Sequence, residues 1–129
     1  MTAEDRLRTH PADRLAAAVQ RVDLVDAAAT LRAEAHAAVA GHRQLAVVRH
    51  GPVSMILFAF ETGGHLKEHE ADGEVIIHVL RGRLSVTVAT EVVTLAAGQL
   101  LALAPGQRHA ARALEESEML LCIARQEGT

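Results

Sequence analysis

The stretch from residue 73 to residue 98, GEVIIHVLRGRLSVTVATEVVTLAAG, decides the fold of this chain. It is rich in β-branched residues, and apolar and polar side chains alternate along it, which is typical of strands with one buried face. In RLSVTV, Leu84, Val86 and Val88 share one face, and this face is predicted to line an apolar interior. The stretch therefore predicts three consecutive short strands in an antiparallel sheet.

The same alternation sorts the side chains of the preceding strand into two sets: Val75, Ile77 and Val79 on one face, and Glu74, Ile76 and His78 on the other. The apolar set is predicted to face the interior, because residues two apart in a strand lie on the same face. Unless a bulge intervenes, Glu74 and His78 then point away from the interior.

Strand-like segments continue along most of the chain from residue 45 onward. Seven are predicted, at residues 45–50, 53–61, 75–82, 83–90, 91–98, 100–106 and 118–124. Turn residues such as Gly51-Pro52, Gly63-Gly64 and Pro105-Gly106 separate them. Short strands at near-regular spacing predict an antiparallel sandwich or barrel.

Residues 12–40 are rich in alanine and carry apolar residues at helical spacing. Asp23 is predicted to cap a helical segment that begins near Leu24, and Gly41 suits its end. We therefore expect one mainly β domain, with an N-terminal α-helical arm at residues 1–42 and an antiparallel β-barrel at residues 43–129. Exposed sheet edges and the apolar helical face predict a homodimer.

The charge and the apolar content of the chain argue against two classes of partner, nucleic acids and membranes. The formal net charge is −3, and no stripe of Lys or Arg could follow a row of phosphates, so nucleic acid is not an expected partner. No apolar stretch approaches the length of a membrane span, and the first residues lack the apolar region of a secretion signal. We expect a cytoplasmic protein without a membrane partner. Its one cysteine, Cys122, is expected to be a small apolar core residue.

Two segments together resemble the two sequence motifs of the cupin superfamily. The first runs from His69 through an acidic turn to the strand that ends at Gly82. The second is GQLLALAPGQRH, in which Gly98, Gly106 and His109 have the family's spacing. The resemblance covers about residues 45–124 and is to small single-domain cupins of unassigned function in particular. It implies the cupin barrel, a double-stranded β-helix.

The second motif departs from the family pattern at two positions. The family's proline lies two residues before the second glycine, where this chain has Ala104, and Pro105 follows one place later. Ala113 stands where the family has an asparagine.

The first motif can be aligned in two registers. Counted back from the closing glycine, the position of the family's glutamate is Val75, which leaves His69 and His109 as the only ligands. Counted forward from His69, Lys67 replaces the first histidine and Glu74 follows at the family's interval, at the cost of a bulge. The resemblance thus implies a divalent transition metal, Zn, Fe, Ni or Mn, on His69 and His109, with Glu74 as a third ligand in the second register.

Two further histidines lie close to this region. His65 shares strand parity with His69, but four residues of strand span ~13 Å, so both can bind one ion only if the chain folds back between them. His78 is expected on the outer face or against a partner subunit. The other histidines, His10, His36, His42 and His50, are interpreted as exposed polar residues.

Three hypotheses about function follow. In the first, the barrel binds a divalent metal through His69 and His109 and acts on, or holds, a small molecule. In the second, the barrel binds or senses a small ligand without metal, which Val75 at the glutamate position favours. In the third, the barrel forms an obligate dimer whose interface is the product of natural selection, and its pocket is vestigial. Arg81, Arg83 and Arg112 could orient a carboxylate ligand, or lie solvated in surface ion pairs; no catalytic residue is assigned.

Overall fold

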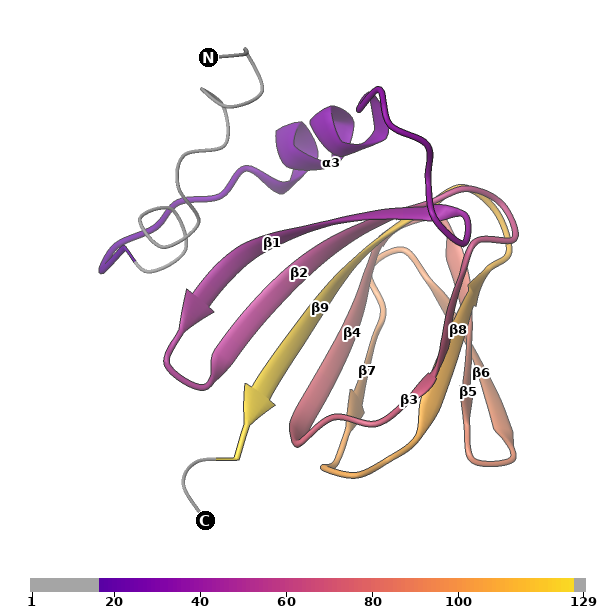
Figure 1. Ribbon diagram of the computed structural model, residues 1–129. Coiled ribbons are helices and arrows are strands. Elements are labelled where there is room, and N and C mark those ends of the chain that lie inside the picture. The colour runs from indigo at the N-terminus through magenta and orange to yellow at the C-terminus, as the bar shows by residue number, and fades with distance from the viewer. Residues whose placement is uncertain (1–16, 127–129) are drawn as a thin grey trace.

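Two antiparallel β-sheets face each other and enclose the main core (Figure 1). The structure is a computed structural model that describes residues 17–126. The five-stranded sheet has the order β1-β2-β9-β4-β7, with bounds His42–His50, Val53–Phe60, Ser117–Arg125, Gly73–Arg81 and Leu100–Leu103. The four-stranded sheet has the order β3-β8-β5-β6, with bounds His65–His69, His109–Ala113, Arg83–Val88 and Glu91–Ala96. This arrangement confirms the prediction of a mainly β, antiparallel fold.

Two of these strands were not among the seven predicted, and they are the strands that carry His69 and His109. Both β3, HLKEH, and β8, HAARA, are five residues long and lack an alternation of β-branched and polar residues. Their strand conformation comes from pairing, since β3 pairs with β8 and β8 with β5. Tertiary hydrogen bonding thus overrides weak local preference.

The core lies between the sheets and follows the predicted alternation. Val75, Ile77 and Val79 of β4 and Leu84 and Val86 of β5 are each at most 3% exposed. They pack with side chains from both sheets, including Phe58, Phe60, Leu95, Leu103, Ala111, Met119 and Leu121. The two inner faces are therefore apolar along most of their length, as expected for sheets packed face to face.

The helix α3, Leu24–Arg32, covers the outer face of the five-stranded sheet (Figure 1). It begins as predicted, because the side chain of Asp23 accepts a hydrogen bond of 3.0 Å from the backbone N–H of Asp26. It ends at Arg32 and not near Gly41, so the helix is shorter than the alanine-rich stretch suggests. Ala28 and Leu31 are buried in a second cluster against β1, β2 and β9.

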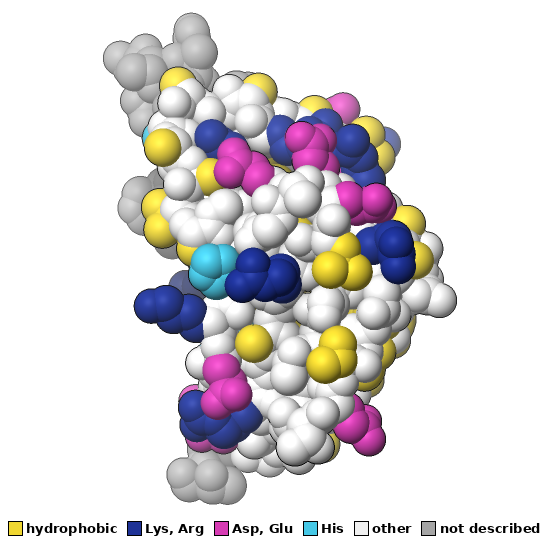
Figure 2. All heavy atoms as spheres, turned by 90° about the vertical axis from the view of Figure 1, so that its right-hand side faces the viewer, with side chains coloured by type: hydrophobic (Ala, Val, Ile, Leu, Met, Phe, Trp, Pro, Cys, Tyr) yellow, Lys and Arg dark blue, Asp and Glu magenta, His cyan; other side chains and the backbone are white. Residues whose placement is uncertain are grey.

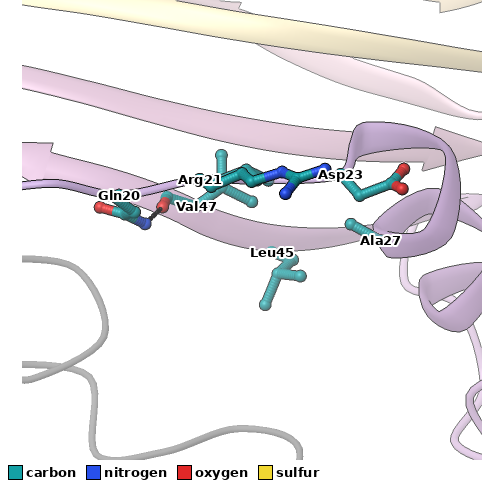
Figure 3. A pocket seen from close by; sticks show the side chains of 7 residues that line it. Gln20, Arg21, Asp23, Ala27, Leu45 and Val47 are labelled. Atoms are coloured by element: carbon teal, nitrogen blue, oxygen red, sulfur yellow. Dashed lines mark hydrogen bonds between the residues drawn. The ribbon is translucent and has the colours of Figure 1, made fainter.

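The segment before the helix runs along β1. Gln20 donates a side-chain hydrogen bond to the carbonyl of Val47, and Figure 3 shows the Arg21 side chain extending toward Asp23. A hollow of about 320 Å³ remains here, lined by Gln20, Arg21, Val22, Asp23, Ala27, Leu45 and Val47. Backbone and side-chain polar groups thus fix this segment on the sheet.

A buried carboxylate joins the helix to the sheet. Glu118 of β9 is 7% exposed, and its Oε2 forms ion pairs with Arg32 of α3 and with Arg81 Nη1 of β4, the latter at 3.6 Å. The side chains of Arg32 and Arg81 are 42% and 52% exposed. Water can therefore solvate both arginines if the carboxylate is removed.

We predict that Glu118→Ala lowers the free energy of unfolding by about 1–2 kcal/mol, because a buried carboxylate with two ion pairs is lost while the two arginines can rehydrate. Glu116→Ala is the control, since Glu116 is 68% exposed and lies 3.9 Å from Arg81; it should cost less than about 0.5 kcal/mol. Urea unfolding followed by far-UV circular dichroism measures both, as the chain has no Trp or Tyr. Equal losses in the two variants would contradict the role given to Glu118.

Candidate functional site

The two histidines of the cupin-like motifs lie side by side between the sheets. His69 of β3 is paired directly with His109 of β8, and their ring centroids are 4.3 Å apart with an interplanar angle of 57°. His109 shares its face of β8 with the buried Ala111 and Ala113, and it is itself 2% exposed. Strand pairing thus brings together two residues forty positions apart, at one end of the core.

A bulge in β3 points His69 toward His109. Leu66 pairs with Ala111 and His69 with His109, so three residues of β3 advance against two of β8. The extra residue lets Leu66 and His69 share the core-facing side despite their odd spacing. The simple parity that groups His65 with His69 is therefore wrong: His65 pairs with Arg112 and lines a groove on the outer face.

Both rings donate a hydrogen bond from Nδ1 to a backbone carbonyl two residues earlier. His69 Nδ1 is 2.8 Å from the oxygen of Lys67, and His109 Nδ1 is 3.0 Å from the oxygen of Gln107. Because a carbonyl oxygen can only accept, Nδ1 carries the proton, and in the neutral ring Nε2 presents a lone pair. Within residues 17–126, the buried Nε2 of His109 has no hydrogen-bond partner.

The environment of His109 favours the neutral ring. Burial lowers the pKa of His109, the hydrogen bond to the Gln107 carbonyl partly offsets this, and the neighbouring His69 lowers it again. A lowered pKa keeps the ring unprotonated at neutral pH. The uncharged imidazole is the form that binds a metal ion or accepts a hydrogen bond.

Glu74 lies away from the histidine pair. It is exposed on the face of β4 opposite Val75, which is 3% exposed and pairs with Leu103. β4 does contain a register shift, but it falls between Val79 and Arg81, beyond the point where it could turn Glu74 inward. In the described part of the chain, no three His, Cys, Asp or Glu side chains are grouped as a metal site.

The remaining histidines lie elsewhere. His78 is half-buried on the outer face of β4, opposite Leu100 of β7, as its parity predicts. His36 and His50 are exposed, and His10 lies outside the described residues. His42 is not exposed as expected: it is half-buried, 5.6 and 5.7 Å from the rings of Phe58 and Phe60. Its position at the start of β1 gave no sign of this packing.

Two adjacent imidazoles with free Nε2 lone pairs can hold one metal ion or accept hydrogen bonds from one ligand. Metal-binding histidines commonly donate the other ring N–H to a carbonyl, which fixes the tautomer and the ring orientation, and both rings here have this arrangement. The donor set therefore fits a transition metal, with further positions left to water or a small molecule.

A model of the cupin domain matches residues 56–124, more than half of the chain. The chain belongs to the cupin family, and this membership indicates a barrel that binds small molecules, in a family where transition metals are frequent. No curated protein matches the chain. In residues 17–126, no helix is long and apolar enough to cross a membrane.

Solved structures confirm the cupin fold. A conserved protein of unknown function from Streptococcus pyogenes matches with a TM-score of 0.69 and 20% identity, over 89% of this chain and 94% of its own. A cupin superfamily protein from Desulfitobacterium hafniense matches with a TM-score of 0.68 and 18% identity, over 88% and 96%. KdgF from a Halomonas species matches with a TM-score of 0.61 and 23% identity, over 71% and 86%. At these identities the likeness is one of fold.

Proposed function

We propose that this chain holds a small molecule in its barrel at His69 and His109, and that the two Nε2 atoms bind a divalent transition metal, Zn, Fe, Ni or Mn. The observation that carries the proposal is the buried Nε2 of His109, which lacks a partner in the described residues and lies beside the ring of His69. A buried polar atom without a partner is costly, so a ligand at this point would stabilise the site.

The chain's own residues hold the rings ready for such a ligand. The Lys67 and Gln107 carbonyls fix both tautomers, and burial keeps His109 neutral. A bound divalent metal would supply Lewis acidity toward an oxygen of the small molecule. With Glu74 on the outer face, the two rings are the protein ligands, and the small molecule or water would complete the coordination.

The second candidate is a binding or sensing barrel that uses no metal. The exposed position of Glu74 and the burial of Val75 favour it, because catalytic zinc sites ordinarily have three protein ligands. In this case the two Nε2 atoms would accept hydrogen bonds from N–H or O–H groups of the ligand. The two candidates use the same site. In the first, the two Nε2 atoms bind a metal ion, and in the second they bind the small molecule directly.

Metal loading separates the candidates. Tag-free protein is incubated in turn with Zn²⁺, Ni²⁺, Mn²⁺ and, without oxygen, Fe²⁺, then desalted and its metal content measured. The proposal predicts close to one equivalent of at least one metal, with binding confirmed by isothermal titration. Protein that retains no metal after loading would leave the metal-free barrel as the function.

We also propose that the chain forms a homodimer and acts in the cytoplasm. On the outer face of the five-stranded sheet, Ile76 of β4 and Leu100 of β7 are 37% and 58% exposed, beside the half-buried Cys122. Adjacent exposed apolar side chains on a sheet often mark an interface.

The dimer proposal predicts that light scattering after gel filtration gives twice the chain mass of 13.7 kDa for the native protein. Leu100→Lys should shift it toward the monomer, because a charge would be buried in an apolar contact. Val92→Lys is the control: Val92 is 64% exposed, but it lies on β6 of the other sheet. A monomeric native protein, or equal shifts by both variants, would contradict the proposed surface.

A further inference from the structure

A polar groove crosses the outer face of the four-stranded sheet. It has a volume of about 300 Å³ and is lined by His65, Leu66, Lys67, Ser85, Thr87, Ala110, Ala111 and Arg112. These residues come from β3, β8 and β5, which are neighbours in the sheet. The groove lies behind the strands that carry the histidine pair, on the side away from the core, so it is separate from the proposed metal site.

Strand register places the lining side chains in two rows. In the first row, His65 pairs with Arg112 and Arg112 with Ser85. In the second, Ala110 pairs with Thr87, and Lys67, two residues after His65 in β3, lines the same outer groove. Since the methyl group of Ala110 is short, it forms the floor of the hollow between longer side chains on either side.

The lining of the groove carries positive charge and hydroxyl groups but no carboxylate. Lys67 and Arg112 are exposed cations, and neither forms an ion pair within the described residues. Arg112 donates one hydrogen bond, from Nη1 to the Gly63 carbonyl at 3.3 Å, which anchors the guanidinium and leaves its other N–H groups for a ligand. The nearby carboxylate of Glu68 is paired with Arg108 at 2.9 Å.

Figure 2 views the molecule from the side of Figure 1 on which β8, β5 and β6 lie. Figure 2 shows a histidine beside basic side chains near the middle of the view, while the acidic side chains in the same view lie above and below this group. An anion site in this chain needs a local positive region, because the formal net charge is −3 and an overall negative protein does not attract anions by itself.

We propose that this groove binds the phosphate group of a small molecule. Arg112 and Lys67 supply a fork of N–H donors and a point charge, and Ser85 and Thr87 supply hydroxyl donors. Together they offer more donors than a carboxylate can use, and they match the several oxygens of a phosphate monoester. Two cations form too short a row for a nucleic-acid backbone, which favours a small ligand.

Phosphate titration of the ¹⁵N-labelled full chain tests the proposal, in a chelator so that no metal at the histidines can bind the anion. The probes are inorganic phosphate, an alkyl phosphate monoester and a short single-stranded oligonucleotide. We expect saturable shifts of backbone amides in β3, β8 and β5 with the first two probes, and weaker binding of the oligonucleotide. Lys67→Ala and Arg112→Ala should each weaken phosphate binding about tenfold.

Arg83→Ala is the matched control, because Arg83 is exposed on the same face of β5 as Ser85 and Thr87 but does not line the groove. Its phosphate affinity should stay within about twofold of the native chain, because an exposed charge that does not contact the anion directly contributes little. Absence of saturable shifts, equal weakening by Arg83→Ala, or tighter binding of the oligonucleotide than of the monoester would each overturn the proposal.

Discussion

His109→Ala is expected to weaken Zn²⁺ binding by more than about 100-fold, because it removes one of the two ring nitrogens proposed to hold the metal. Loss of even an outer partner of a metal ligand costs about 10–100-fold in affinity, and loss of a ligand itself costs more. His69→Ala should have an effect of the same order, since the two rings are 4.3 Å apart and act on one ligand. Competition of each variant with a chelator of known affinity measures the loss.

Two other histidines provide controls for this prediction. His78 is half-buried on the outer face of β4, and His65 lines the outer groove, so neither reaches the space between the paired rings. His78→Ala and His65→Ala should bind Zn²⁺ within about twofold of the native chain. If either control loses as much affinity as His109→Ala, or if His109→Ala binds like the native chain, the metal is held elsewhere.

The second large effect is expected at Gly82, where Ala should lower the free energy of unfolding by about 3 kcal/mol or more. Gly82 has a φ of +83°, and a Cβ there would lie 2.3 Å from the Glu116 carbonyl oxygen and 2.3 Å from Ser117 Oγ. Neither neighbour can easily move, because Ser117 is buried and its hydroxyl is hydrogen-bonded to the backbone of Arg83.

Gly98→Ala separates crowding from backbone strain. Gly98 has a nearly identical φ of +85°, but a Cβ there meets nothing within 4 Å. It should cost only about 1–2 kcal/mol, the penalty of the left-handed conformation for an L-residue. Urea unfolding followed by circular dichroism compares the two variants. Equal losses would mean that the close contact at Gly82 relaxes without cost.

The sequence predicts the parts of this fold that carry a strong local pattern. The alternation in residues 75–88 identifies the inward set correctly, and Asp23 marks the start of the helix. The strands β3 and β8 lack such a pattern, and their conformation depends on partners far along the chain. The helix ends early, at Arg32, although alanines continue beyond it.

The candidate site, too, is only partly predictable from local sequence pattern. Motif spacing points to His69 and His109, and strand pairing brings them together. The bulge after Leu66 cannot be read from HLKEH, because a polar edge strand has no apolar alternation to reveal a shifted register. The tautomers depend on the positions of the Lys67 and Gln107 carbonyls. The outer groove depends on β3, β8 and β5 lying side by side. No local stretch of sequence encodes either feature.

Nitrogen NMR of the histidine rings tests the central claim most directly. Long-range ¹H–¹⁵N spectra are recorded at a pH of about 8, above the ordinary histidine pKa of about 6.5, with signals assigned from the single His→Ala variants. The Nδ1–H tautomer is predicted for both His69 and His109, and Zn²⁺ should shift both Nε2 signals together at one equivalent. Nε2–H tautomers, or Nε2 signals that Zn²⁺ leaves unmoved, would contradict a metal site at this pair.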